Sequence, residues 1–379
     1  MADLVIVGDC NPDVMVLTGD ITPAFGQQEQ LVPAISLVVG GSAAITAVAA
    51  ARLGARVELV AAIGDDAAGQ FMLAELRRAG VGTGHVVVRG DLPTGMSVAL
   101  SRGGDRAILT APGGIATLTA DDIPAGLLAG ARHVHLSSYF LMEERLAPGL
   151  PAVFAAARAA GTVTSLDTNW DPSGRWGGAR LREVLAETDL LLPNEAEALR
   201  IAGAPGLGEA VAALAAGGAS VAVKRGGGGA ILATDGVRYQ ATAPARRVVD
   251  TTGAGDCFNA GLITALLAGR GPADALALAC AAGTGSTSAV GGTAGCPDLP
   301  AALALARDVT VHPFEPLVPD ADSDLSGLTC QAAAGIRAVV RHEFDDPVAE
   351  DVGFLSVSVT WKAPRVPGRS VGSDRGRCE

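Results

Sequence analysis

The sequence predicts an α/β protein with a mostly parallel central sheet that helices cover on both faces. Short, almost continuously apolar runs alternate with Ala- and Leu-rich stretches up to about residue 300, which is typical of parallel strands buried on both faces. The expected strands are 4–7, 57–61, 133–136, 163–166, 190–192, 221–224 and 230–233. The expected helices are 42–53, 69–79, 150–160, 208–216, 257–267 and 273–288. Because ligands bind beyond the C-terminal ends of the strands in such folds, the functional loops are expected at 8–13, 167–172, 193–197, 225–229 and 251–256.

Two β-rich regions, residues 14–39 and 94–110, interrupt this alternation. They contain β-type stretches with no helix between them, and Arg102-Gly103-Gly104-Asp105 is typical of a hairpin turn. The two regions therefore predict a small antiparallel sheet that stands off the main sheet as a lid.

The chain changes character from about residue 307, where Pro, Asp, Ser and Arg become more frequent and the strand–helix rhythm is lost. We therefore expect one domain over residues 1–306 and a partly disordered C-terminal extension of unknown role over residues 307–379. Within the extension, residues 331–341 predict a short helix and residues 354–361 a short strand.

Composition narrows the choice of partner and compartment. The net charge of −12 argues against nucleic acid or an anionic membrane as the main partner. The chain passes from Asp3 directly into an apolar strand, without the pattern of a signal peptide. The six cysteines contain no Cys-x-x-Cys pair, so we expect free thiols in a reducing cytoplasm and no zinc site; they stand at positions 10, 257, 280, 296, 330 and 378.

The most informative segment is Asp-Thr-Thr-Gly-Ala-Gly-Asp at residues 250–256. Gly253 and Gly255 let the backbone turn tightly, and the apolar run that follows predicts a helix whose first N–H groups would form an anion site. Asp256 is then either a general base for an attacking hydroxyl or an ordinary N-cap of the helix. These seven residues alone favour neither interpretation.

Two further motifs are suited to holding a small polar ligand. Gly40 and Gly41 precede an Ala-rich helix, where glycine permits close approach of the backbone to a ligand. Asn11 and Asp13 follow the first strand and could bind sugar hydroxyls, although an Asx/Pro turn explains them equally well.

Two more motifs are suited to phosphate and metal. Asn194 and Glu197 end a buried strand and could hold a hydrated Mg²⁺, although a capping box is the realistic alternative. Lys224 precedes a glycine run at residues 226–229, which suits phosphate contact. Neither the P-loop pattern nor the dinucleotide-binding Gly pattern after the first strand occurs, so a P-loop nucleotidase and a Rossmann oxidoreductase have little support.

Taken in order, these segments resemble the ribokinase/PfkB family of sugar and nucleoside kinases. Gly40-Gly41, the Ala-Arg-Leu-Gly at residues 51–54 and the Gly-Asp turn at residues 64–69 resemble its N-terminal signature, and residues 250–256 resemble its C-terminal one. The resemblance covers residues 1–306 and implies a ribokinase-like three-layer sandwich with a small β lid, that is, a PfkB-type carbohydrate kinase domain.

The resemblance also implies residue roles. Asp256 would take the proton from the acceptor hydroxyl, and Gly253, Ala254 and Gly255 would donate backbone N–H groups to the γ-phosphate. The substrate would contact Asn11, Asp13, Gly40 and Gly41. The nucleotide would contact Asn194, Lys224, Gly226 and Gly229, with the adenine near residues 291–294. Mg²⁺ would be held through water by Glu197, and a monovalent cation such as K⁺ would lie at Asp250, Thr252, Ser286, Ala289 and Gly291.

The implied activity is ATP-dependent phosphorylation of a primary hydroxyl on a small sugar or sugar derivative, by an enzyme that can dimerise through its lid. The alternatives are a nucleoside kinase of the same fold and a non-catalytic sugar-binding protein. Many sugar kinases of this family have Asn where this chain has Ile45. We therefore expect a more apolar acceptor pocket, to which ribose is poorly suited.

Overall fold

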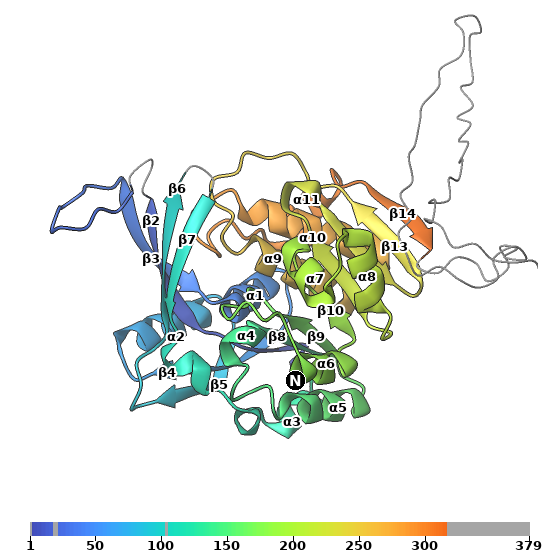
Figure 1. Ribbon diagram of the computed structural model, residues 1–379, viewed down its shortest axis with the longest axis horizontal. Coiled ribbons are helices and arrows are strands. Elements are labelled where there is room, and N and C mark those ends of the chain that lie inside the picture. The colour runs from blue at the N-terminus through green and yellow to red at the C-terminus, as the bar shows by residue number, and fades with distance from the viewer. Residues whose placement is uncertain (1, 18–21, 103–104, 317–379) are drawn as a thin grey trace, which may run out of the picture. The chain divides into compact units, whose positions relative to one another are not determined.

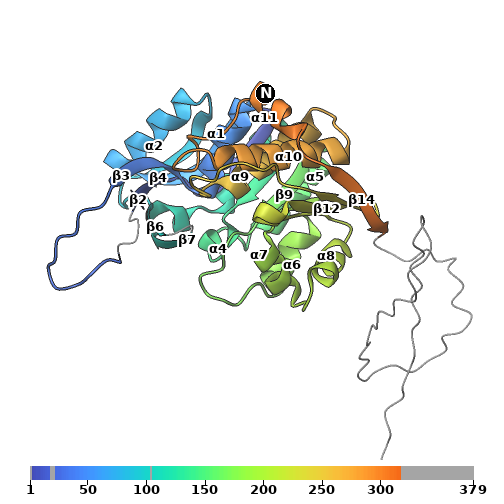
Figure 2. The same cartoon turned by 90° about the horizontal axis from the view of Figure 1, so that it is seen from above.

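Strand β1 (Leu4–Val7) lies inside the main sheet and shows how the fold is built. It pairs in parallel with β4 (Val57–Gly64) on one side and β8 (His133–Ser137) on the other. Leu4 and Ile6 enter one hydrophobic core and Val5 and Val7 the other, because successive side chains of a strand point to opposite faces. A core on each face of the sheet makes a three-layer protein, as the two ribbon views show (Figures 1 and 2).

The computed structural model describes residues 2–17, 22–102 and 105–316, and within these residues the main sheet has ten strands. Their order is β14 (Val311–Pro316), β13 (Val237–Ala241), β12 (Ala230–Thr234), β11 (Ser220–Lys224), β10 (Leu190–Leu191), β9 (Val163–Asp167), β8, β1, β4 and β5 (Gly82–Arg89). Neighbours from β11 to β5 are parallel, and those from β11 to β14 are antiparallel. The predicted mostly parallel α/β sheet is confirmed.

Helices cover both faces of this sheet. One core is shared by α1 (Ser42–Arg52), α2 (Ala67–Arg78), α9 (Ala254–Leu267), α10 (Pro272–Ser286) and α11 (Leu299–Ala306). The other is shared by α3 (Ala125–Ala129), α4 (Tyr139–Met142), α5 (Leu150–Ala159), α6 (Ala179–Ala186), α7 (Glu195–Ala202) and α8 (Leu207–Ala215). Among the described residues no single helix has the length and apolar character to cross a membrane, and only the bent pair α7–α8 meets that test jointly.

Helices α9 and α10 approach each other closely because glycines lie at their contact. A Cβ on Gly261 would lie 2.9 Å from the Cα of Ala279, and a Cβ on Gly283 would lie 2.9 Å from the carbonyl oxygen of Ala254. Only hydrogen fits in those places, since real Cβ atoms do not approach other atoms so closely. The contact at Gly283 reaches the first residue of α9, so α10 fixes where α9 begins.

A second sheet of four strands forms the predicted lid (Figure 1), in the order β3 (Ala34–Gly40), β2 (Asn11–Leu17), β6 (Met96–Arg102) and β7 (Asp105–Ala111). The β2–β3 and β6–β7 pairs are antiparallel as predicted, but β2 and β6 are parallel. The reason is that β2 and β6 follow β1 and β5, which run in the same direction in the main sheet. The predicted hairpin turn at residues 102–105 includes residues 103–104, which lie outside the described residues.

Asp66 joins the lid to the main domain. It is the N-cap of α2 and accepts from the N–H of Gly69 at 2.8 Å, a role that Asp commonly takes at the start of a helix. The same carboxylate accepts from the N–H of Thr94 at 2.8 Å and from its hydroxyl at 2.6 Å. Thr94 directly precedes β6, so this lid strand is anchored to the start of α2.

The main sheet continues further along the chain than its apolar pattern indicates. Strand β14 lies beyond residue 306 and pairs with β13, so the compact unit of the chain continues through residue 316. The helix expected at residues 331–341 and the strand expected at 354–361 lie outside the described residues.

Candidate active site

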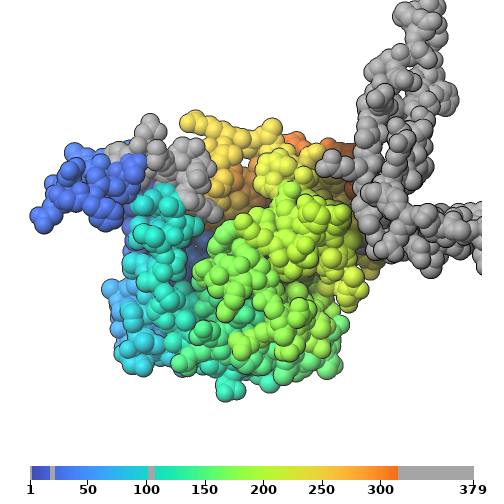
Figure 3. All heavy atoms as spheres, viewed as in Figure 1, coloured from blue at the N-terminus to red at the C-terminus, as the bar shows by residue number. Residues whose placement is uncertain are grey.

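A cavity of about 890 Å³ opens at the C-terminal ends of the central strands. Four of the five predicted loops line it, namely those at residues 167–172, 193–197, 225–229 and 251–256, together with Ser42 at the start of α1 and Ile108 of the lid. Figure 3 shows the surface hollowed between the teal lid strands and the green part of the main domain. The cavity therefore lies at the edge of the sheet where ligands bind in α/β folds.

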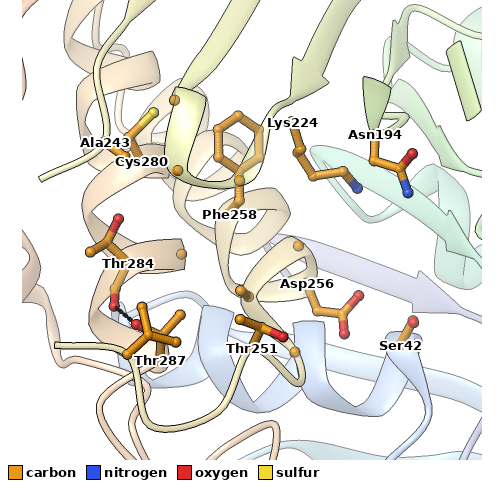
Figure 4. A pocket seen from close by; sticks show the side chains of 18 of the residues that line it. Ser42, Asn194, Lys224, Ala243, Thr251, Asp256, Phe258, Cys280, Thr284 and Thr287 are labelled. Atoms are coloured by element: carbon orange, nitrogen blue, oxygen red, sulfur yellow. Dashed lines mark hydrogen bonds between the residues drawn. The ribbon is translucent and has the colours of Figure 1, made fainter. Parts of the chain in front are cut away.

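Asp256 faces this cavity from the first turn of α9 (Figure 4). The N-cap of α9 is Gly253 and no side chain caps the helix, so the N-cap interpretation of Asp256 is wrong. Its side chain is nearly buried, with 7% of the residue exposed. Burial, with the negative charge of Asp167 adding to it, raises the pKa of Asp256 to about 8.

The turn before α9 has a backbone that only glycine tolerates at its centre. Gly253 has a φ of 73°, and a Cβ there would lie 2.6 Å from the Cα of Gly292. The N–H of Ala254 donates to the carbonyl oxygen of Thr251 at 3.2 Å, so this amide is partly engaged within the turn. Gly253, Ala254 and Gly255 all line the cavity, at the helix end where backbone N–H groups attract anions.

Lys224, at the end of β11, extends toward the same space as Asp256 (Figure 4). Its ammonium donates to Asp167 Oδ2 at 2.5 Å and to Asn259 Oδ1 at 3.3 Å, while Asn259 Nδ2 donates to Asp167 Oδ2 at 2.6 Å. Burial alone would lower the pKa of Lys224, but the charges of Asp167 and Glu197 outweigh it and raise that pKa. The lysine is therefore a fixed positive charge in the cavity.

Asn194 and Glu197 form a complete capping box at the start of α7. The N–H of Glu197 donates to Asn194 Oδ1 at 2.9 Å, and Asn194 donates to the Glu197 carboxylate from its backbone at 2.8 Å and from its side chain at 2.6 Å. Burial, followed by the charge of Asp167, raises the pKa of Glu197 to about 7. Among the described residues no three or more His, Cys, Asp or Glu side chains are placed to hold a metal. The site fits an ion such as hydrated Mg²⁺, which keeps most of its water ligands and needs only one or two carboxylates.

The four residues predicted to bind the acceptor come together at the base of the lid. Asn11 Nδ2 donates to Asp13 Oδ1 at 3.0 Å and to Ser97 Oγ at 3.2 Å. Gly40 lies against the Asp13 carboxylate, and Gly41 lies against the Asn11 side chain. None of the four lines the 890 Å³ cavity, but Ser42, which follows Gly41, does.

Local sequence patterns do not predict the polar contacts around Ser42. Asp9 accepts from the backbone N–H groups of Ser42 and Ala43 at 3.0 and 2.9 Å. Asn169, held at a φ of 55°, donates from Nδ2 to the hydroxyls of Ser42 at 2.6 Å and Ser138 at 2.8 Å. Asn169 lies in a loop that the strand pattern marks as functional, but its contact with Ser42 spans 127 residues and no local pattern predicts it.

The Ile45 side chain is buried beneath the turn before α9. It is 3% exposed and does not line the cavity; its side chain packs beneath Gly253 and against Gly292. Ile45 therefore supports the turn before α9. Because the four residues expected to bind the acceptor do not line this cavity either, the expected effect of Ile45 on the acceptor pocket stays a prediction. The segment at residues 291–294, expected near adenine, packs against Ile45 through Gly292 and does not line the cavity either.

The structure joins most of the residues of the expected cation site. Asp250 Oδ1 accepts from the N–H and hydroxyl of Thr252 at 3.0 and 2.8 Å, and Asp250 Oδ2 accepts from the N–H of Gly291 at 2.8 Å. Ser286 ends α10 and its carbonyl contacts Gly295. Ala289 lies on the segment between α10 and Gly291. Asp250 therefore links the turn before α9 to the loop after α10.

Known proteins resemble this chain in sequence and in fold. Residues 1–299 match the sequence profile described as pfkB family carbohydrate kinase. Ribokinase from Bacillus subtilis is 30% identical over 309 residues, covering 78% of this chain and 97% of that protein. An uncharacterized sugar kinase from Archaeoglobus fulgidus is 29% identical over 223 residues, covering 58% of this chain and 86% of that protein.

Solved structures show the same architecture. Arabidopsis thaliana ribokinase complexed with ribose and ATP superposes with a TM-score of 0.68 at 28% identity, covering 81% of this chain and 99% of that one. A putative ribokinase II from E. coli in complex with ATP and Mg²⁺ superposes with a TM-score of 0.72 at 23% identity over the same shares, which shows the fold alone.

The ribokinase-like fold and the family match define a phosphotransferase, and Asp256 and Lys224 both line its cavity. The chain belongs to the pfkB family of carbohydrate kinases. The predicted family, the ribokinase-like fold and the assignment as an ATP-using sugar kinase are confirmed.

Proposed function

We propose that the protein transfers the γ-phosphoryl group of ATP to a primary hydroxyl of a small sugar or sugar derivative, with Asp256 as general base. The observation that carries the proposal is the position of the Asp256 carboxylate, at the start of α9 and inside the cavity that Lys224 also lines. A base for the attacking hydroxyl and donors for the transferred charge are what phosphoryl transfer requires of a protein.

In the proposed reaction the acceptor hydroxyl donates a hydrogen bond to Asp256, which takes its proton as the oxygen bonds to the γ-phosphorus. The bond from the γ-phosphorus to the bridging oxygen breaks, and ADP leaves with that electron pair. Lys224 and the N–H groups of Gly253, Ala254 and Gly255 face the charge on the moving group. Such preorganised donors contribute most where water is excluded, and Ile108 brings the lid to the same cavity.

The acceptor lies, in this proposal, on the lid side of Asp256, near Ser42 and Asn169, with Asn11, Asp13, Gly40 and Gly41 behind them. The nucleotide phosphates lie along Asn194, Lys224, Gly226 and Gly229. Small and apolar residues line the rest of the cavity and suit the flat adenine base; they include Ala243, Pro244, Phe258, Cys280, Gly283 and Thr284.

Two ions complete the proposal. Mg²⁺, held through water by Glu197 and Asn194, would neutralise negative charge on the nucleotide phosphates. K⁺ would bind among Asp250, Thr252, Ser286, Ala289 and Gly291, where the hydrogen bonds of Asp250 already connect the two loops. The four described cysteines are free thiols, which supports a reducing, cytoplasmic compartment.

The lid provides the proposed contact for a second copy of the chain. Leu37, Val14, Val98 and Leu109 are paired in one row across its four strands, with Leu37 48% and Leu109 66% exposed. The adjacent row carries Asp13 and Ser97 and so belongs to the opposite face. An apolar outer face on a sheet whose inner face serves the site suits a homodimer.

The test is an ADP-release assay with MgATP over pentoses, hexoses, keto-deoxy sugar acids and nucleosides. With the acceptor that the wild-type protein uses, Asp256→Asn should lower kcat by about 10²- to 10⁴-fold, because the general base is lost. Asp298→Asn is the matched control, since Asp298 caps α11 and Asn caps helices equally well. Near-normal turnover of Asp256→Asn would contradict the assignment of Asp256 as the base. A nucleoside as the preferred acceptor would contradict the proposal that the acceptor is a sugar.

A further inference from the structure

Three carboxylates lie near the single ammonium group of Lys224, but only one of them holds it. Lys224 interacts electrostatically with Asp167, Glu197 and Asp256. Its direct carboxylate contact is with Asp167 Oδ2 at 2.5 Å. Asp167 is 1% exposed, whereas the Lys224 side chain is 12% exposed and lines the cavity, so the carboxylate is removed from water and the ammonium group borders the ligand space.

The sheet explains how two residues from non-adjacent strands meet. Asp167 ends β9 and Lys224 ends β11, and β10 lies between them. Two strand spacings amount to about 10 Å, which a lysine and an aspartate side chain can jointly cross when both lie on the same face of the sheet. Leu166 and Val223, which precede them, enter the core that α3 to α8 share, so Asp167 and Lys224 both point to the opposite face, where α9 packs. Residues 192–194 continue between the two strands, and Asn194 pairs with Lys224.

A third residue fixes the pair from the helix that carries the proposed base. Asn259, in the second turn of α9, is 0% exposed. Its amide donates to Asp167 Oδ2 at 2.6 Å and its carbonyl accepts from Lys224 Nζ at 3.3 Å. The Asn259 side chain thus joins both members of the ion pair to α9.

These contacts place the lysine beside the turn before α9. A Cβ built on Gly255 would lie 3.6 Å from Lys224 Nζ, and Gly255 and Lys224 both line the cavity. If the ammonium paired with Asp256 instead, it would reduce the tendency of that carboxylate to accept a proton. The contact with Asp167 and Asn259 leaves Asp256 available to the acceptor.

We infer that Asp167 and Asn259 are positioning residues, which together hold the ammonium group of Lys224 beside Gly255 so that it faces the phosphoryl group in transfer. The inference rests on the proposed function. Asp167 thus acts through Lys224, and the loss of the Asp167 carboxylate impairs the transfer step more than it impairs the binding of nucleotide.

A double-mutant cycle of Asp167→Asn and Lys224→Met tests this directly. Asp167→Asn keeps the shape of the side chain and the oxygen that accepts from Asn259 but removes the charge. We expect Asp167→Asn to lower kcat by about 100-fold, as misplacement of a catalytic group does, while the affinity for MgADP in calorimetry falls much less, because ADP lacks the phosphoryl group that Lys224 faces. In the Lys224→Met background the same substitution should lower kcat no further. Multiplicative losses, or wild-type kcat in Asp167→Asn, would overturn the inference.

Asn259→Ala is the second variant, for the case that Asp167→Asn does not fold. It should lower kcat in the wild-type background and have no effect in the Lys224→Met background. Asp122→Asn is the control, because it breaks the Arg89–Asp122 ion pair, which lies away from the cavity; it should lower the melting temperature and leave kcat unchanged. If the wild-type protein transfers phosphate to none of the acceptors, the proposed function fails. If it phosphorylates an acceptor but the kcat losses of the two single variants multiply in the double variant, only this inference fails.

Discussion

Asp256 is a carboxyl group that its surroundings keep protonated near neutral pH. Burial and the charge of Asp167 raise its pKa to about 8, and a general base works only when it is deprotonated. We therefore predict that kcat/KM for the acceptor rises with pH through about 8 and levels off above it. Initial rates over a pH series at constant ionic strength measure this. A profile that is flat from pH 6 upward, or that rises only near the ordinary pKa of aspartate, about 4, would contradict it.

The turn before α9 offers a second test at the scale of one residue. Gly253→Ala adds a Cβ that would lie 2.6 Å from the Cα of Gly292 at a φ of 73°. We predict a destabilisation of about 1–3 kcal/mol from the strained backbone and a large loss of kcat, because the turn must move. Unfolding by urea and steady-state kinetics measure the two effects.

Gly269→Ala is the matched control for this prediction. Gly269 lies just beyond the other end of α9 with the same φ of 73° and nothing within 4 Å of its Cβ position. This variant should show the cost of the left-handed backbone alone and keep its kcat. Equal kinetic losses in both variants would refute a special role for the turn at Gly253.

At the residue scale, the sequence predicts groups that act within one short segment. Residues 250–256 contain the proposed base and the turn together, and Asp256 and the turn both line the cavity. Ile45 shows the limit of such reasoning, because its side chain packs against Gly292, 247 positions later in numbering, and no local rule predicts that contact. The Asn169–Ser42 contact is hidden for the same reason.

At the scale of elements, β14 determines where the chain can be shortened. Residues 311–316 cover the edge of β13, and Val311 packs against the core that α9 and α10 share. We predict that a chain ending at Pro316 keeps the melting temperature and kcat of the full protein, whereas one ending at Arg307 melts at a lower temperature. Differential scanning fluorimetry and the ADP-release assay compare the two chains. Equal melting temperatures would show that β14 is not needed for stability.

The elements found from sequence are those with long apolar runs. Strands β1, β4, β8 and β11 are buried on both faces, and their patterns predict them well. The apolar pattern does not predict strands β5 and β13, because polar residues such as His85 and Arg238 interrupt their apolar runs, as is common in strands with one exposed face. The parallel pairing of β2 with β6 depends on the direction of the main sheet, which local sequence does not contain.

At the scale of the whole molecule, the lid face makes a prediction about assembly. Replacing Leu37 and Leu109 together by serine should convert a dimer into a monomer, because it removes the two most exposed positions of the apolar row across the lid. Light scattering coupled to size exclusion measures the mass. Val163→Ser is the control, since Val163 is an exposed apolar residue of the main sheet, at 42%. A wild-type monomer, or a double variant that still dimerises, would rule out this contact.

The close approach of α9 and α10 also bears on how this enzyme can be engineered. Replacing helical glycines by alanine usually stabilises a protein, by about 0.4–1 kcal/mol where the backbone tolerates it. Gly261 and Gly283 are exceptions, because the space for a methyl group is filled by Ala279 and by the carbonyl of Ala254. A methyl group at Gly283 would displace the residue that opens the proposed anion site. Directed evolution toward heat resistance therefore has to leave these two positions unchanged, Gly261 for packing and Gly283 because its neighbour Ala254 belongs both to the packing and to the proposed anion site.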